Sequence, residues 1–369
     1  MEILHICNAY QTNPLYQLLF TELSHLGLTQ EVIAPGESGG DLTIEDVRVY
    51  KYKRDTTLIG RVLWPVKIKR LKSFAEKKVC INKVDIIHAH TLFSDGAVAY
   101  RLYKAFGTKY SVAVRNTDLN DYFRIPLFRP LGYKILENSK RVYLISEANK
   151  QQFLNTLPEK RREDIASKIK IIPNGINEFW LKSVYTGNRV VVDKVSLIYA
   201  GDICHNKNIH TIAAAVEEDA KGLIKGFEAV GLKDGESGSY ITSIKKQIET
   251  SSRIHLSPKC KKEELLEKFR KADVYIQPSF TETFGLSYIE ALTQGLPVIY
   301  SKGQGIDGMF EDGLVGYAVD PSSPKDILSK ISMIRDRYEA ISDNISHLDF
   351  SRFRWSGIAN DYINDYKLI

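Results

Sequence analysis

Two glutamates, Glu282 and Glu290, stand with seven residues between them in the segment 272–300. An apolar run that ends at Pro278 predicts a strand; a loop with Gly285 follows, and then a helical pattern. The first turn of a helix offers unpaired N–H groups and a positive dipole end, and glycine lets a ligand approach closely. The segment therefore predicts a diphosphate site, with carboxylates placed to reach sugar hydroxyls.

The two carboxylates alone leave other interpretations open. On an ordinary strand–loop–helix unit they would be one solvated loop residue and one helix residue. A carboxylate pair also suits a glycosidase that works by acid and base or by double displacement. The elements and motifs around the pair must decide between these possibilities.

Short apolar, β-branched runs alternate with helical patterns along the whole chain, which is typical of doubly wound α/β domains with parallel sheets. The chain's 369 residues are enough for two such domains. A turn signal at 173–175 and a less regular stretch over 176–193 separate two series of strands. The predicted strands are 2–7, 31–34, 85–88, 110–114, 141–145 and 170–172, then 195–200, 253–256, 272–277, 297–300 and 316–319.

The boundary is therefore predicted at residue 176, giving an N-terminal domain over 1–176 and a C-terminal domain over 177–349. The tail has apolar residues at helical spacing from Trp355 to Tyr366. This spacing predicts a last amphipathic helix, whose apolar stripe must be buried against another part of the fold.

The residues around the pair, TETFGLSYIEALTQGLPVI, resemble the retaining glycosyltransferases of family 4, whose Glu-x7-Glu motif is matched by Glu282 to Glu290. The resemblance covers most of the chain. It includes DIIHAH at 85–90, YLISEANKQQF at 143–153, IIPNGIN at 171–177, IYAGDICHNKNI at 198–209 and FSRFRWSGIANDY at 350–362.

The resemblance implies the GT-B fold, with two Rossmann-like domains facing across a cleft and the C-terminal helix, 350–369, crossing back to the N-terminal domain. It implies an acceptor-binding N-terminal domain and a C-terminal domain that binds a nucleotide-sugar donor. It further implies transfer with retention of anomeric configuration, and neither a cofactor nor a catalytic metal. The donor would be a substrate.

By the same resemblance, Glu290 would bind the ribose hydroxyls and Glu282 the donor sugar, while Lys207 would neutralise leaving-group phosphate charge, as a cation otherwise would. The backbone of 284–286 would bind the diphosphate, and the backbone around Leu256 the base. The expected donor-binding set is Gly201, Lys207, Ser257, Pro258, Glu282, Thr283, Phe284, Gly285, Leu286 and Glu290.

Three departures from the family pattern affect these expectations. Asp202 follows Gly201, where many relatives have an arginine, so Lys207 must carry more of the phosphate clamp, with Lys302 or Arg115 as possible helpers. The segment NAYQTNP at 8–14 replaces a glycine-rich loop. The expected acceptor-side residues are Asn8, Gln11, Thr12 and His90.

A histidine common after the fourth strand of relatives is also absent, since residues 114–118 read VRNTD. We expect Asn116 or Asp118 to replace it near the sugar. The expected catalytic set is Glu282, Lys207, Asn116 and Asp118.

Together these features predict transfer of a hexose from a nucleotide-diphosphate sugar, with UDP expected, to a glycan or polyprenyl-linked acceptor in surface polysaccharide biosynthesis. The leaving diphosphate would take the acceptor proton during front-face substitution. A glycosidase is disfavoured because Lys207 and the anion site would serve no purpose on a neutral glycan. A nucleotide-sugar epimerase and a noncatalytic glycan-binding homologue stay open as alternatives.

Two further motifs are weaker signals. GQGIDG at 303–308 fits GxGxxG but follows a late strand, so it argues little for NAD; its glycines would lie beside the donor, with Asp307 near a sugar hydroxyl. His88 and His90 form an HxH pair with no third metal ligand at suitable spacing, which places them at the cleft floor or in the core.

Charge is concentrated between Arg48 and Lys78, with eleven Lys or Arg against two acids, although the whole chain carries only +6. A basic stretch with apolar residues and Trp64 suits an anionic membrane surface, at about 1 kcal/mol per basic residue. A solvated helix that packs its apolar side on the sheet fits equally well. Nucleic acid is not expected, because the aromatics form no stacking series.

No window approaches the roughly 20 apolar residues of a spanning helix, and the N-terminus lacks a basic and apolar leader. We therefore expect a cytoplasmic protein, with peripheral binding to the inner face of the plasma membrane as an option. The four cysteines are far apart without a CxxC, which argues against a zinc ribbon or a redox dithiol.

Overall fold

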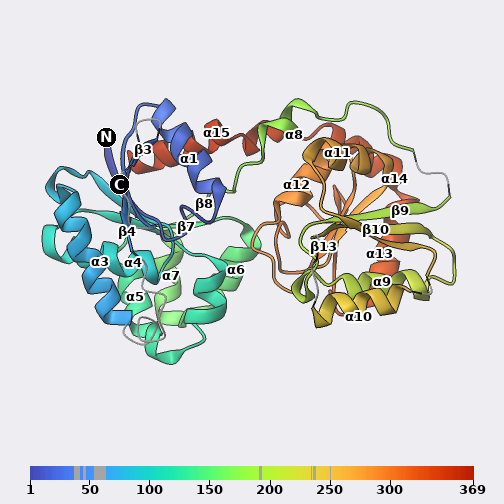
Figure 1. The fold of residues 1–369 in the computed structure, drawn as a ribbon, viewed down its shortest axis with the longest axis horizontal. Helices are drawn as coiled ribbons and strands as arrows, with labels where there is room; N and C mark the ends of the chain where they lie inside the picture. Colours follow the sequence, from blue (N-terminus) through green and yellow to red (C-terminus); the bar gives the residue numbers. More distant parts are fainter. Residues whose placement is uncertain are drawn as a thin grey trace. The chain divides into compact units, whose positions relative to one another are not determined.

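The computed structural model describes residues 1–36, 42–44, 47–53, 64–190, 193–233, 235, 238–249 and 251–369. The chain forms two compact units (Figure 1). The N-terminal unit comprises 1–145, 150–175 and 355–369, and the C-terminal unit comprises 146–149 and 176–354. The chain thus changes units at 175/176, beside the boundary that we placed at residue 176.

The described part of the N-terminal unit contains an eight-stranded sheet in the order β3-β4-β2-β1-β5-β6-β7-β8, parallel except for the pair β3 and β4. The strands are β1 (Glu2–Ile6), β2 (Thr29–Pro35), β3 (Leu42–Ile44), β4 (Val47–Tyr52), β5 (Ile86–Ala89), β6 (Tyr110–Ala113), β7 (Arg141–Leu144) and β8 (Ile169–Ile171). The helices are α1 (Pro14–His25), α3 (Trp64–Lys78), α4 (Ser94–Phe106), α5 (Arg129–Asn138), α6 (Glu147–Thr156), α7 (Glu159–Ser167) and α15 (Trp355–Tyr366).

Alternate residues of β1 build the two cores of this unit. Leu4 and Ile6 join the cluster under α3 and α4, whereas Ile3 joins the cluster under α1 and α15. Successive side chains of a strand point to opposite faces, so a strand covered on both sides reads as a continuous apolar run. This is why Glu2–Ile6 was recognisable as a buried parallel strand.

Helix α15 belongs to the N-terminal unit although the C-terminal unit precedes it in the chain. Asp365, with a side chain only 4% exposed, accepts hydrogen bonds from Arg141 Nε at 3.0 Å and from the Tyr143 hydroxyl at 2.8 Å. A Cβ at Gly175 would lie 2.6 Å from the Trp355 ring, so this residue lets the helix start pack closely. The predicted burial of the tail on the N-terminal domain is confirmed.

The described part of the C-terminal unit contains a six-stranded, all-parallel sheet in the order β11-β10-β9-β12-β13-β14. The strands are β9 (Val195–Ala200), β10 (Ile224–Leu232), β11 (Ile254–Pro258), β12 (Val274–Gln277), β13 (Val298–Ser301) and β14 (Gly316–Val319). The helices are α8 (Glu178–Lys182), α9 (Ile209–Glu218), α10 (Ser239–Ile248), α11 (Lys262–Lys271), α12 (Leu286–Thr293), α13 (Pro324–Asp336) and α14 (Tyr338–Ser346).

The strand order of this sheet reverses between β9 and β12. From β9 the chain adds β10 and β11 on one side, then returns to add β12, β13 and β14 on the other. Such a reversal separates the loops that follow the two central strands, and ligands of open α/β sheets bind there, beyond the carboxyl ends. The two parallel α/β units confirm the predicted fold class.

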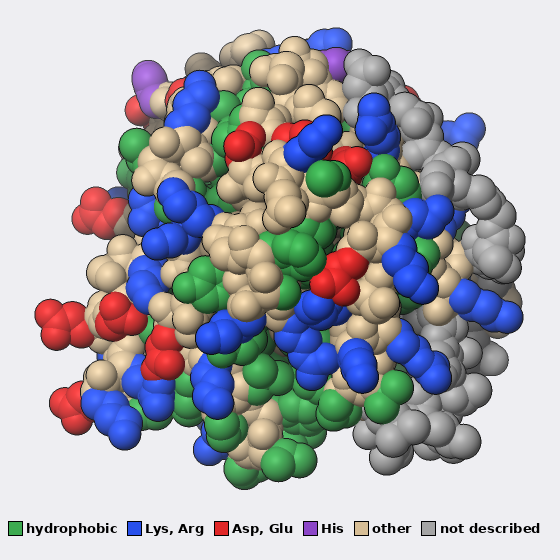
Figure 2. Space-filling model, turned by 90° about the vertical axis from the view of Figure 1, so that its left-hand side faces the viewer, with side chains coloured by type: hydrophobic (Ala, Val, Ile, Leu, Met, Phe, Trp, Pro, Cys, Tyr) green, Lys and Arg blue, Asp and Glu red, His purple; other side chains and the backbone are tan. Residues whose placement is uncertain are grey.

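The basic stretch lies only partly within the described residues, since 54–63 fall outside them. On α3, Ile68, Leu71 and Ala75 are buried in the core under the sheet. Lys69, Arg70, Lys77 and Lys78 are exposed, and Figure 2 shows many Lys and Arg side chains on this side of the N-terminal unit. The apolar face of α3 is therefore used for packing, and the helix exposes mainly charged side chains, together with Pro65 and Val66 in its first turn.

None of the described helices has both the length and the apolar character needed to cross a lipid bilayer.

The Asp365 contacts predict a stability effect. Asp365→Ala leaves the Arg141 guanidinium and the buried Tyr143 hydroxyl without their acceptor, so the free energy of unfolding should fall by about 2 to 3 kcal/mol. Asp361→Ala removes an exposed carboxylate from the same helix and should change it by less than about 0.5 kcal/mol. Urea unfolding checks both values, and equal effects would contradict the anchoring role of Asp365.

Candidate functional site

Two loops meet at the reversal point of the C-terminal sheet. One follows β9 and ends in a short 3-10 turn at His205–Lys207; the other follows β12 and leads into α12. Asn206 joins them through four hydrogen bonds. Its carbonyl accepts from Phe280 N at 2.9 Å, its Nδ2 donates to Thr281 O at 2.9 Å, and its Oδ1 accepts from Thr281 N and Oγ1 at 3.0 and 2.6 Å.

This junction brings Lys207 and Glu282 together, one from each loop. Lys207 Nζ lies 2.6 Å from Glu282 Oε2, and the side chains are 24% and 14% exposed. The other carboxylate oxygen, Oε1, accepts from Thr283 N at 3.0 Å. A charged pair that is mostly shielded from water interacts more strongly than a surface pair. The structure therefore places the two predicted charged residues in direct contact.

A third side chain, Gln277, reaches the same carboxylate. It is the last residue of β12 and is only 2% exposed. Its Nε2 donates to Glu282 Oε2 at 2.7 Å, and its Oε1 accepts from the Tyr275 hydroxyl at 2.6 Å and from Ser287 Oγ at 2.9 Å. Sequence reasoning missed Gln277 and Asn206. The available signal was a polar residue at the end of the apolar run VYIQ.

The start of α12 has the geometry of an anion site. Gly285 precedes the helix with φ +77°, and no described side chain caps the first turn. A Cβ at Gly285 would lie 2.4 Å from the Tyr288 ring, so only glycine fits this position. The half-buried residues Thr283 and Leu286 flank it, whereas Phe284 is buried. Unpaired N–H groups of this turn, close to Lys207 and Glu282, suit a phosphate.

The glycine-rich loop 303–308 packs on the same segment. Gly305 N donates to Glu282 O at 2.8 Å, and Glu282 N donates to Gln304 Oε1 at 3.0 Å. Asp307 Oδ2 accepts from Gly303 N, so its carboxylate is tied to its own loop. The loop follows β13 rather than the first strand of the unit, which disfavours the dinucleotide interpretation.

Other expected donor residues lie inside α12 or at the end of β11. Glu290 is half-buried on α12, and burial raises the pKa of its carboxyl to about 7 against the opposing effects of Lys262 and Trp180. Ser257 Oγ donates to Glu228 Oε1 at 2.5 Å, and the next residue, Pro258, is exposed.

Gly201 is exposed directly after β9, and the next residue, Asp202, pairs with Lys233 at 3.2 Å. A salt-bridged carboxylate thus stands where many relatives would have the clamp arginine.

In the N-terminal unit, Asn8 follows β1 and is held on both sides. Its Nδ2 donates to Asp95, and its Oδ1 accepts from the Tyr52 hydroxyl. Burial raises the pKa of Asp95 to about 7. Gln11 and Thr12 are exposed on the following loop. These three predicted acceptor-side residues lie on one loop at the carboxyl edge of this sheet.

Asp118 does not have the catalytic placement that we expected. It is 1% exposed, and its two oxygens accept backbone N–H bonds from Leu92, Phe93 and Arg115 at 3.0, 3.2 and 2.9 Å. Its carboxylate therefore joins the loops after β5 and β6 and is not offered to a ligand. Burial raises its pKa to about 6 despite these bonds. Asn116 is half-buried and accepts from Asn120 Nδ2, so it stays a candidate.

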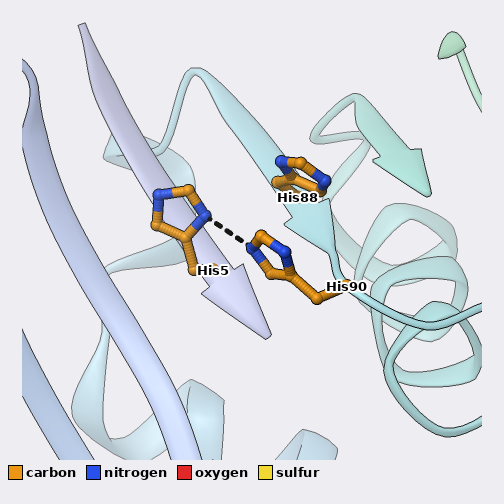
Figure 3. Close-up of side chains that lie close together, drawn as sticks. All are labelled: His5, His88 and His90. Carbon is orange, nitrogen blue, oxygen red and sulfur yellow. Dashed lines mark hydrogen bonds between the residues drawn. The ribbon is translucent and has the colours of Figure 1, made fainter. Parts of the chain in front are cut away.

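His90 does not have the acceptor-side placement that we expected. It is 1% exposed and lies in the core, which was one of the two placements expected for the HxH pair. It joins His5 and His88 in a buried cluster (Figure 3). His5 Nδ1 lies 3.1 Å from His90 Nε2, and His88 Nδ1 lies 2.5 Å from the Tyr366 hydroxyl. Burial lowers the pKa of all three, that of His5 to about 3, so the cluster is neutral at physiological pH.

His5 is the third histidine that the sequence did not reveal, and ring nitrogens of the three lie within 4.8 Å of one another. However, the His88 and His90 rings are stacked, with centroids 4.1 Å apart and planes at 18°. Lone pairs in nearly parallel, offset ring planes do not converge on one ion. The hydrogen bonds to Gln30 and Tyr366 fit a core network instead.

Comparison with known proteins concerns the family and the fold. Residues 17–178 match the family described as "Glycosyltransferase Family 4", and residues 188–343 match the family "Glycosyl transferases group 1". A similar relative, the alpha-monoglucosyldiacylglycerol synthase of Acholeplasma laidlawii, is 27% identical over 296 residues, which cover 72% of this chain and 73% of the relative.

Solved structures share the fold over nearly the full length. The sucrose-phosphate synthase of Thermosynechococcus elongatus aligns with a TM-score of 0.74 at 19% identity, covering 100% of this chain and 98% of the synthase. Anabaena Alr3699/HepE in complex with UDP and glucose aligns with a TM-score of 0.69 at 15% identity, with 100% of both chains covered.

The C-terminal sheet lies within one family match, the N-terminal sheet except β1 lies within the other, and the whole chain aligns with these solved structures. The chain therefore belongs to the family 4 type of glycosyltransferases and has the GT-B fold.

Proposed function

We propose that the protein is a retaining glycosyltransferase that transfers a hexose from a UDP-sugar to a glycan or lipid-linked glycan. The observation that carries this proposal is the Lys207–Glu282 pair beside the uncapped start of α12. One cation, one carboxylate and the N–H groups of a helix start lie together here, which is what binding of a diphosphate and its sugar would require. The bound UDP of Alr3699/HepE supports the choice of nucleotide.

Each residue of the site has a distinct role in the proposed reaction. Glu282 accepts a hydrogen bond from a hydroxyl of the donor sugar, and Glu290 accepts hydrogen bonds from the ribose hydroxyls. Lys207 and the N–H groups at the start of α12 stabilise the charge that develops on the leaving diphosphate. These groups supply the stabilisation that a metal would otherwise give, so we propose transfer without a metal or another cofactor. The leaving phosphate then takes the acceptor proton on the face where the bond breaks.

The proposed acceptor class is a glycan on a lipid or growing surface polysaccharide. Two relatives point this way by name: the alpha-monoglucosyldiacylglycerol synthase and the lipopolysaccharide 1,2-N-acetylglucosaminetransferase of Salmonella typhimurium, 26% identical over 237 residues (58% of this chain, 60% of the relative). Asn8, Gln11 and Thr12 are the residues of the N-terminal unit that we propose on the acceptor side, and Asn116 is the residue that we propose near the donor sugar.

We further propose that α3 binds the anionic inner face of the plasma membrane mainly by charge, because Ile68, Leu71 and Ala75 are already buried in the core and only its first turn exposes apolar residues, Pro65 and Val66. Each exposed Lys or Arg near such a surface contributes about 1 kcal/mol, and the attraction falls within a Debye length.

The first prediction from this proposal concerns transfer itself. Nucleotide release from a panel of UDP-, GDP- and ADP-sugars should require one UDP-sugar and should rise when a membrane-lipid extract is added. Glu282→Ala should lower kcat at least about 100-fold, because it removes the acceptor for the sugar hydroxyl and the partner of Lys207. Nuclear magnetic resonance of the product should show the anomeric configuration of the donor.

Glu311→Ala, which removes an exposed carboxylate of the same unit, is the control and should leave kcat unchanged. Conversion of the donor without an acceptor would instead indicate an epimerase. Binding of UDP without turnover of any donor would indicate the noncatalytic alternative, which the Asp202–Lys233 pair at the clamp position favours.

A second prediction follows from Glu290. Its pKa of about 7 means that the carboxyl is largely protonated at pH 6 and ionised at pH 8. Since an ionised acceptor binds ribose hydroxyls more strongly, the donor KM should be about fivefold lower at pH 8 than at pH 6. A UDP-sugar diphosphate does not titrate in this range. Glu290→Gln should raise KM and remove its pH dependence; a variant with the wild-type pH dependence would exclude Glu290 as its source.

A third prediction tests the membrane proposal. The protein should bind vesicles that contain phosphatidylglycerol but not pure phosphatidylcholine, and binding should fall with salt. Changing Lys69, Arg70, Lys77 and Lys78 together to Gln should weaken binding at least about tenfold. The control changes four exposed lysines of the C-terminal unit, Lys221, Lys225, Lys245 and Lys246. An equal loss in both variants would show that α3 is not the binding surface.

A further inference from the structure

The carboxylate of Glu282 depends on a buried amide that has no assigned role. Gln277 ends β12 and has almost no exposed surface, so its polar atoms must find partners within the protein. Two hydroxyls, those of Tyr275 and Ser287, lie 2.6 and 2.9 Å from its Oε1, and Glu282 Oε2 lies 2.7 Å from its Nε2.

The partners also determine which way the amide faces. A hydroxyl can donate or accept, so Tyr275 and Ser287 would tolerate either orientation of Gln277. An ionised carboxylate can only accept, and a reversed amide would set its oxygen 2.7 Å from Glu282 Oε2. The NH₂ group must therefore face Glu282, and the two hydroxyls must then donate to the amide oxygen.

The three donors to Glu282 differ in stiffness. Lys207 reaches Oε2 on a long, flexible side chain, and Thr283 N belongs to the neighbouring peptide. Gln277 is anchored by the sheet and by two hydroxyls, one of them from the first turn of α12. It is therefore the rigid contact that fixes the carboxylate relative to the helix start.

We infer that Gln277 is a positioning residue that holds the Glu282 carboxylate in place when Lys207 is drawn to the donor phosphates. This inference rests on the proposed function, in which Lys207 serves both the carboxylate and the diphosphate. While Lys207 is shared, Gln277 keeps Oε2 engaged, and Oε1 retains a lone pair for a sugar hydroxyl. Tyr275 and Ser287 act one step further away, by orienting the amide.

The test compares two replacements of Gln277 over the pH range 6 to 8. Gln277→Glu keeps the size and both hydroxyl contacts but sets a second carboxylate against Glu282. Its kcat should fall about 100-fold at pH 8, and the deficit should shrink towards pH 6, where the carboxylate pair takes up a proton and regains a donor. Gln277→Leu cannot regain a hydrogen-bond donor, so its kcat should stay lowered at every pH.

Two further variants separate positioning from folding. Gln294→Glu makes the same change in a buried glutamine at the other end of α12. Gln294 is hydrogen-bonded to Ser183 O and Arg270, which lie outside the Glu282 network, so this variant should show the wild-type pH dependence of kcat. Ser287→Ala removes one hydroxyl and should lower kcat severalfold without loss of fold. UDP alone lacks the sugar, so its affinity should change less than about twofold in Gln277→Glu and Ser287→Ala.

The outcomes distinguish the two proposals. Wild-type enzyme without transfer from any donor would overturn the proposed function. The positioning role is wrong, while the function stands, if the wild type transfers sugar and kcat of Gln277→Glu changes with pH in parallel with that of the wild type. The same conclusion holds if Gln277→Glu loses as much UDP affinity as it loses kcat.

Discussion

The ion pair between Lys207 and Glu282 is the interaction on which the C-terminal unit's site depends. Its members come from loops that follow β9 and β12, the two strands between which the sheet order reverses. Neither loop is regular, so its position must be fixed by specific bonds rather than by a repeating ladder. Asn206 forms hydrogen bonds between the two loops. Gln277 forms one from the sheet, and Gln304 forms one from the glycine-rich segment.

The same arrangement explains why polar residues occupy positions that would otherwise be core. A partly shielded charge pair is favourable only when hydrogen bonds satisfy its remaining lone pairs. Gln277 donates a hydrogen bond to the Glu282 carboxylate from inside the unit, and the Tyr275 and Ser287 hydroxyls donate to the amide oxygen of Gln277. The polar chain therefore reaches from the sheet to the first turn of α12, and it couples the carboxylate to the proposed anion site.

The fold and the principal site residues could be predicted because they leave local patterns. Buried parallel strands such as Glu2–Ile6 are continuous apolar runs, and Glu282, Gly285 and Glu290 lie in one contiguous motif. Three strands escaped prediction, however. β3 has only three residues, β4 lies at the start of the basic stretch, and β10 reads IKGFEAVGL, with two glycines and two charged residues that blur its pattern.

Contacts between distant residues left no such trace. Asp118 looked available for catalysis because a sequence cannot show that three backbone N–H groups point at its oxygens. The third histidine of the buried cluster, His5, lies 83 residues before His88 and is joined to it only by the pairing of β1 with β5.

The return of α15 makes the N-terminal unit a discontinuous domain, and this has a consequence for the order in which the chain folds. Residues 355–369 leave the ribosome after the whole C-terminal unit, so His88 and the apolar face beside α1 stay uncovered until that unit has been synthesised. The C-terminal unit is complete in sequence by residue 354 and can form its core earlier. The unit whose synthesis begins first is thus completed after the other, and the nascent chain exposes one face of its sheet to chaperones or to aggregation while the C-terminal unit is being made.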